Sequence, residues 1–135
     1  MDRTEAAQVL SILKAAYPNY YKGMGAEEAQ GTISVWSLQF ADTSAEIVLM
    51  ALNKAIATNK FPPTIAEIKE KISSLHWEAY DKLYMNYAAV ELPEDEERLY
   101  QRIYEATEGY KYNNRIEPSI EQMCGKNNTR LLSGG

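Results

Sequence analysis

Three groups of residues in this 135-residue chain have types that could carry chemistry: the single histidine, the single cysteine and a run of four acids. His76, with Glu78 two residues later, reproduces the His-x-Glu part of a zinc deaminase site. That site also needs a Pro-Cys-x-x-Cys pair to hold the metal, and structural zinc takes four nitrogen or sulfur ligands. Because Cys124 is the only cysteine, we expect no metal site and no other cofactor. His76 is expected on a helix surface or at an interface.

The cysteine and the acids also fail to form a catalytic set. A nucleophilic cysteine needs a base held within hydrogen-bond reach, and Cys124 lies in a stretch rich in Asn, Gly and Ser that offers no rigid frame. The acids at 94–97 point around the start of a helix, where the helix dipole favours negative charge. No glycine pattern of a phosphate-binding loop occurs in the sequence. The sequence therefore predicts a protein that is not an enzyme and has no catalytic residues.

The composition argues against two further classes of protein. The formal net charge is −5, with 7 Lys/Arg against 8 Asp/Glu in residues 1–75 and 7 against 11 in residues 76–135. Because cations must neutralise phosphates in a nucleic-acid complex, no direct high-affinity binding to nucleic acid is expected. The polar start MDRTEAAQ is unlike a signal peptide, and no run of about 18 apolar residues predicts a membrane span. We expect a cytoplasmic protein that does not bind membranes.

Apolar spacing predicts helices along most of the chain, and no strand alternation persists. Thr4 is the expected N-cap of the first helix, which Pro18 ends. Thr43 and Glu46 match a capping box for the third helix. The apolar faces of the first three helices consist of Ala6, Val9, Leu10, Leu13, Ala16 and Tyr17, then Ile33, Val35, Trp36, Leu38 and Phe40, and then Ile47, Val48, Ala51, Leu52, Ala55 and Ile56. The predicted fold class is all-α, a small helical bundle with a further C-terminal helix and a flexible tail.

The stretch ATNKFPPTIAEI in the middle of the chain predicts a stiff corner between two helices. Pro62 and Pro63 lack N–H donors and cannot continue the third helix. Thr64 and Glu67 form a capping box for the fourth helix, whose apolar face consists of Ile65, Ile68, Ile72 and Leu75. Phe61 is expected to pack beneath the corner. This stretch is interpreted as a structural corner rather than a site.

Ten tyrosines are the compositional oddity of the chain, and most of them follow residue 76. Trp77, Tyr80, Tyr84 and Tyr87 have helical spacing, so helix continues or restarts after the Ser73-Ser74 pair. Base stacking would need an accompanying cationic groove, but acids stand among these tyrosines as often as cations do. Core packing or a protein–protein interface is the better interpretation.

Together these patterns divide the chain into three parts. Residues 1–75 form a helical N-terminal domain, residues 76–109 an additional helical and Tyr-rich segment, and residues 110–135 a flexible tail that is the candidate partner-binding segment. Within the tail, Pro118 at a first helical position could open one short amphipathic turn.

Residues 1–72 resemble the N-terminal domain of the phage replicative-helicase loader/inhibitor family in the order of their features. The resemblance rests on MDRTEA at the start, on LKAAYP at 13–18, on Trp36 and, most specifically, on ATNKFPPTIAEI at 57–68. It implies a compact helical domain followed by a flexible C-terminal region. It also implies a protein encoded by a phage or prophage and made in a bacterial host cell.

The resemblance further implies an adaptor of DNA replication that is not itself an enzyme. Members of this family bind the hexameric replicative helicase, inhibit it and load it at an origin marked by a phage initiator, which is a second partner. They contact the helicase through the C-terminal region. That role falls here on the segment after about residue 110, where the apolar candidates are Ile120, Met123, Leu131 and Leu132.

Two alternatives remain open at this point. A small helical DNA-binding protein would need a basic recognition helix, and the predicted helices at 45–58 and 65–75 each carry few cations. An anti-host protein that sequesters a bacterial replication factor would share the tight helicase contact of a loader, so the sequence does not separate these two.

Overall fold

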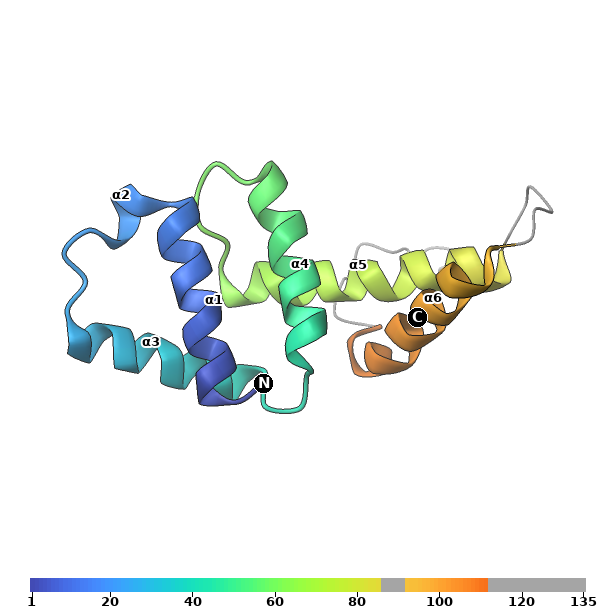
Figure 1. Cartoon of the computed structure of the whole chain (residues 1–135), viewed down its shortest axis with the longest axis horizontal. Helices are drawn as coiled ribbons and strands as arrows, with labels where there is room; N and C mark the ends of the chain where they lie inside the picture. Colours follow the sequence, from blue (N-terminus) through green and yellow to red (C-terminus); the bar gives the residue numbers. More distant parts are fainter. Residues whose placement is uncertain (86–91, 112–135) are drawn as a thin grey trace, which may run out of the picture.

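The computed structural model describes residues 1–85 and 92–111. In these ranges the chain forms helices and no strand, which confirms the predicted all-α class (Figure 1). The elements are α1 (Arg3–Ala16), α2 (Pro18–Tyr21), α3 (Ala26–Gln39), α4 (Ala45–Thr58), α5 (Ile65–Tyr84), α6 (Glu94–Ala106) and the short 3-10 helix η1 (Glu108–Tyr110).

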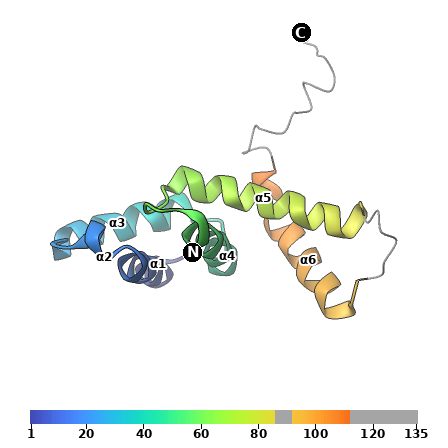
Figure 2. The ribbon, with the colours of Figure 1, turned by 90° about the horizontal axis from the view of Figure 1, so that it is seen from above.

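The molecule is elongated, and α5 connects its two ends. α1, α2, α3 and α4 lie at one end of the molecule, where α4 packs against α5, and α6 packs against the second half of α5 from the other end (Figures 1 and 2). In Figure 2, α6 meets α5 near η1 and slants away from it toward Glu94. α5 runs without a break through residue 75, so the helix predicted to continue or restart after Ser73-Ser74 continues.

The core is formed mainly by aliphatic side chains from α1, α4 and α5. Val9, Val48, Leu52, Ile68 and Ile72 are each at most 1% exposed. Removing a side chain of this size from water stabilises the fold by roughly 1.5–3 kcal/mol. The predicted apolar faces of α1 and α4 are therefore buried except at Ala16, which is exposed, and Ile56, which is half-buried. In α6, Ile103 is buried in the core, and Leu99, Tyr100 and Tyr104 pack against it.

The predicted face of α3 is only partly correct. Ile33, Trp36 and Phe40 are buried as expected, but Val35 is 50% exposed and Leu38 is 73% exposed. Positions 35 and 38 lie on a different side of a helix from 33, 36 and 40, because successive residues are turned by about 100°. The helix therefore has a second apolar surface that faces outward.

The predicted cap of α1 differs from the observed one. Asp2, not Thr4, is the N-cap, and its carboxylate accepts a hydrogen bond from the Glu5 backbone N–H at 2.8 Å. Glu5 returns the contact by accepting from the Asp2 backbone N–H at 2.9 Å. The complete capping box explains why the helix begins at Arg3.

The capping box predicted for α4 was wrong. Ser44 is the N-cap and its hydroxyl accepts from the Ile47 backbone N–H. The Thr43 hydroxyl is instead hydrogen-bonded to the Tyr110 hydroxyl, and Glu46 accepts from Arg102 of α6 at 2.9 Å. Both side chains have partners more than fifty residues away, which a local pattern does not reveal.

The corner between α4 and α5 has the predicted cap. Thr64 Oγ1 accepts from the Glu67 backbone N–H at 3.1 Å, and the Thr64 N–H donates to the Glu67 carboxylate at 2.9 Å. Phe61 does not pack beneath the corner, because it is 59% exposed. Pro63 takes the buried position instead, and the Tyr17 hydroxyl supports the corner by donating to the Asn59 carbonyl at 3.0 Å.

Candidate partner-binding surfaces

His76 lies between α5 and α6 and is only 1% exposed. Its Nδ1 is 3.0 Å from the Thr107 hydroxyl oxygen, and that hydroxyl lies 2.6 Å from the Ile103 carbonyl, to which it donates. Because the Thr107 proton is used, Nδ1 carries the hydrogen and donates to Thr107. Burial lowers the pKa of His76, so the ring is neutral near pH 7. The histidine therefore acts as a structural link between the two helices.

The potential metal ligands do not converge in the described part of the chain. No group of three or more His, Cys, Asp or Glu side chains is placed to hold an ion within residues 1–85 and 92–111. Across the same ranges, no helix is long and apolar enough to cross a membrane.

Tyr80, Tyr84 and Tyr104 pack where α6 meets α5. The Tyr104 ring stacks on His76 with centroids 4.7 Å apart, and it lies 5.6 Å from the Tyr84 ring. Tyr80 is 5.5 Å from Tyr84 and 5.6 Å from Trp77. These rings supply the attachment of α6, while Tyr84 stays 55% exposed at its edge.

The segment that follows α6 is attached to the body of the protein up to Lys111. The Trp77 indole N–H donates to the Lys111 carbonyl at 2.9 Å, and the Tyr110 hydroxyl is bonded to Thr43. The first two residues of the expected tail are therefore packed against α5 and the turn before α4. The four apolar candidates of the tail, Ile120, Met123, Leu131 and Leu132, lie outside the described residues.

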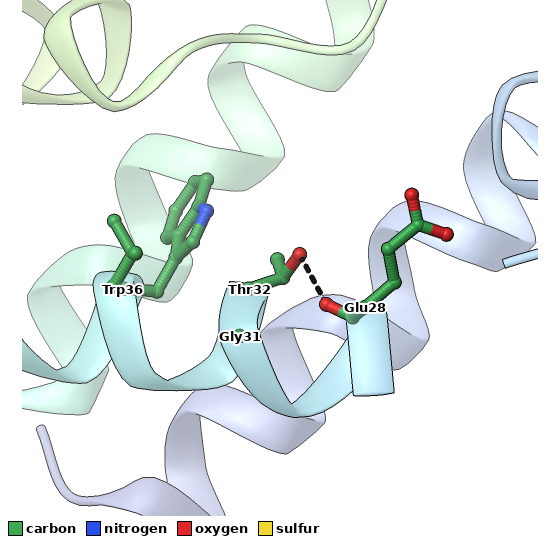
Figure 3. A pocket seen from close by; sticks show the side chains of 5 residues that line it. Glu28, Gly31, Thr32 and Trp36 are labelled. Atoms are coloured by element: carbon green, nitrogen blue, oxygen red, sulfur yellow. Dashed lines mark hydrogen bonds between the residues drawn. The ribbon is translucent and has the colours of Figure 1, made fainter. Parts of the chain in front are cut away.

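Two exposed apolar surfaces remain at the N-terminal end. The first is the outer face of α3, where an open hollow of about 490 Å³ is lined by Glu28, Gly31, Thr32, Val35 and Trp36 (Figure 3). Labelled side chains rise from the same side of the helix, and the Thr32 hydroxyl donates to the Glu28 carbonyl at 3.0 Å. Sequence reasoning missed this surface because it assigned Val35 and Leu38 to the core.

The second surface is the α4–α5 corner itself. Phe61 meets Tyr20 of α2 edge to face, with ring centroids 5.8 Å apart, and both side chains are more than half exposed. A hollow of about 420 Å³ lies beside them, lined in part by Lys60, Pro62 and Glu67. The corner is therefore an accessible edge of the fold as well as a structural turn.

α4 and α5 do not present a basic surface of the kind that binds DNA. In α4 the only cation, Lys54, lies 3.6 Å from Glu78 of α5. In α5 the sequence IAEIKEKISSLHWEAYDKLY holds three lysines and four acids. Neither helix therefore has the excess of positive charge needed to neutralise DNA phosphates.

Comparison with known proteins connects the N-terminal half of the chain to a family of phage proteins. Residues 1–69, just over half of the 135-residue chain, match the family model for the N-terminal domain of a phage helicase loader/inhibitor. No curated protein and no solved structure matches the chain. The matched region contains α1 to α4, the corner and the start of α5, which are the parts that carry the resemblance in the sequence. The chain belongs to the phage helicase loader/inhibitor family.

Proposed function

We propose that this protein is a DNA-replication adaptor that binds the hexameric replicative helicase, inhibits it and loads it at a phage origin. The observation that carries the proposal is the family match over residues 1–69. The buried and hydrogen-bonded state of His76 agrees with it, because the only histidine of the chain has no access to a substrate. On this proposal the protein acts by binding and has no catalytic residues.

We propose that the three parts of the chain have different roles. Residues 1–75 form the family domain, residues 76–109 add the α5–α6 attachment, and residues 110–135 carry the helicase contact. The hydrogen bond from Trp77 to the Lys111 carbonyl supports this order, because it fixes the point from which the last part departs. The α5–α6 pair then holds the start of the segment that binds.

The proposed contact uses the apolar residues of the last part: Ile120, Met123, Leu131 and Leu132. A segment that orders only on its partner spends part of its binding energy on ordering and is released more readily. A loader needs such release, since it must give up the helicase after delivery. The net charge of −5 also keeps the adaptor off the DNA that receives the ring.

The proposal is tested by capture of purified host and phage replicative helicases on immobilised protein. Full-length protein should retain a helicase hexamer, and a chain that ends at Lys111 should not. Leu131→Ser with Leu132→Ser should weaken capture strongly. The matched pair Asn127→Ser with Asn128→Ser changes the same segment without removing apolar surface and should leave capture intact.

Other outcomes distinguish the alternatives. Failure to capture either helicase, together with binding to duplex DNA at moderate salt, would contradict the proposal and support a DNA-binding protein. Capture of the host helicase without any delivery to origin DNA would support an anti-host protein. Undiminished capture by the chain that ends at Lys111 would move the contact to the described helices and leave only the tail assignment wrong.

A further inference from the structure

The outer face of α3 carries a stripe that no described element covers. Glu28, Thr32, Val35 and Gln39 follow one another at spacings of four, three and four residues, so they lie along one side of the helix. Three of these side chains are exposed and Thr32 is half-buried. The flank of α3 toward α1 is already occupied, because Arg3 donates to the Gln30 side chain at 2.6 Å. The free stripe is therefore available to another helix.

The same face holds both a protruding side chain and a space that could receive it. Leu38 is 73% exposed near the C-terminal end of α3. Seven residues earlier, a Cβ placed on Gly31 would have nothing within 4 Å. The hollow beside Gly31 is bordered by the apolar surfaces of Val35 and Trp36 (Figure 3). Glu28, Thr32 and Val35 of the stripe also line this hollow, and Gly31 forms its edge on the flank that carries Leu38, two turns away.

Opposite charges stand at the two ends of the stripe. Glu28 is exposed at the N-terminal end. At the C-terminal end, Lys69 of α5 donates to the Gln39 side chain at 3.1 Å, and its ammonium lies 5.6 Å from the centre of the Phe40 ring. Neither Glu28 nor Lys69 forms an ion pair within the described residues. A second helix that runs antiparallel would bring each charge to its opposite.

We propose that the outer face of α3 binds the same face of a second copy of this chain, with the two helices antiparallel. A two-fold axis at the level of Ile33 and Ser34 places Thr32 opposite Val35 of the second copy. On the flank, Leu38 enters the hollow beside Gly31 of the second copy. Each contact occurs twice, because a two-fold axis exchanges the partners.

The charges at the two ends of the stripe favour a second copy over an unrelated helix as the partner of α3. In this register Glu28 lies opposite Gln39 of the second copy and reaches the Lys69 that Gln39 holds. When two identical copies pair about a two-fold axis, a side chain of one copy meets its complementary group on the other only if the axis brings those two positions together. The projection with its hollow and the acid with its lysine both satisfy that condition. These two independent pairs of complementary groups support pairing of the α3 face with the same face of a second copy.

The contact is small, and the dimer is accordingly weak. A single pair of 14-residue helices buries less than the roughly 1,200 Å² that stable complexes bury. Dimers therefore form at high protein concentration, or where several copies are held close together on one partner.

The first test is sedimentation velocity of the full-length protein from about 10 μM to about 1 mM, the regime of weak interfaces. The wild-type sedimentation coefficient should rise with concentration toward that of a dimer. Leu38→Asp should stay monomeric throughout. Phe61→Asp, which alters an exposed apolar side chain at the corner, should behave as wild type.

The second test uses charge exchange and is specific for the two-fold pairing. Glu28→Lys alone places two like-charged contacts in the dimer, and so does Lys69→Glu alone, so each should weaken association by about tenfold. An equimolar mixture of the two variants restores both opposite-charge contacts and should recover near wild-type association. Glu27→Lys makes the same charge change one residue off the stripe and should have little effect.

Three outcomes would overturn the inference: a wild-type protein that stays monomeric to about 1 mM, association that survives Leu38→Asp, or a mixture that fails to recover. A monomeric wild type whose helicase capture is lost in Leu38→Asp would assign the face to the helicase and overturn it as well. Self-association is measured without helicase, so its failure leaves the proposed function standing.

Discussion

The contacts among α1, α4 and the start of α5 are mainly aliphatic, whereas α6 is attached by rings and side-chain hydrogen bonds. In the first region Val9, Leu52 and Ile68 exclude water and need no particular partner atom. In the second, His76 must meet Thr107 and Trp77 must meet the Lys111 carbonyl, and such bonds weaken steeply when distance or angle changes. The first region should therefore unfold only with the whole protein, while α6 can separate alone.

The largest effect is expected from a cavity in the aliphatic region. Leu52 is fully buried in α4, so Leu52→Ala should lower the free energy of unfolding by about 2–5 kcal/mol. Urea unfolding followed by circular dichroism measures this loss. Leu38→Ala removes the same atoms from an exposed position and should change the value by less than about 0.5 kcal/mol. Equal losses for the two variants would contradict the assignment of the core.

A smaller effect, confined to α6, is expected from Thr107→Val. The substitution keeps the shape but removes the hydroxyl oxygen that accepts from the buried His76 Nδ1–H, at a cost of about 1–3 kcal/mol. Hydrogen exchange should become faster in α6 and in the second half of α5, with α1 unchanged. Thr32→Val removes a hydroxyl that bonds only within α3 and serves as the control. Faster exchange in α1 would show that the two regions are not separable.

The next effect is a dependence of stability on pH that comes from His76. Burial lowers its pKa from the ordinary 6.5, so the unfolded chain binds a proton more readily than the folded one. The stabilisation is complete above pH 6.5 and is lost as pH falls below it, by at most about 1.4 kcal/mol per pH unit. His76→Leu should flatten this slope.

Two carboxylates also make stability depend on pH, and they limit the pH range in which the contribution of His76 can be measured separately. Arg102 lowers the pKa of Glu46, and Lys111 lowers the pKa of Glu108, each from 4.5. Their contributions are present above pH 4.5 and are lost as pH falls through the lowered values. Unfolding measured between pH 7 and pH 5 therefore reports mainly on His76. An unchanged slope in His76→Leu would assign the dependence to another group.

The smallest effect is expected from the ion pair between α4 and α6. Arg102 and Glu46 are 2.9 Å apart, but both side chains are about half exposed, and exposed pairs contribute little. Glu46→Gln should cause the smallest loss of the series, and salt should abolish the difference from wild type because it screens the pair. A loss comparable to that of Thr107→Val would contradict the view that α6 is held chiefly by its buried contacts.

The same contrast explains what the sequence could predict. The faces of α1 and α4 follow from apolar spacing, and the cap of α5 follows from Thr64 and Glu67. These signals are local and repeat along one helix. They also suffice for the all-α class and for the corner between α4 and α5.

The errors arise where a side chain has a distant partner or a helix has two apolar sides. The pattern at Thr43 indicates a cap, but its hydroxyl bonds Tyr110. The spacing of Leu38 indicates core, although it lies on the outward side of α3. Phe61 is exposed rather than inside the corner, where Pro63 and the Tyr17 hydroxyl already fill the space. Spacing along the chain does not show which of two nearby apolar residues faces inward.

The central claim is that this chain restrains a replicative helicase by binding it, and the most direct measurement is helicase ATPase activity during titration. Full-length protein should lower the steady-state ATPase rate of the cognate hexamer in a saturable way, with a stoichiometry set by the ring. The chain that ends at Lys111 should leave that rate unchanged at the same concentrations. An ATPase rate that full-length protein does not alter, for either the host or the phage helicase, would contradict the account.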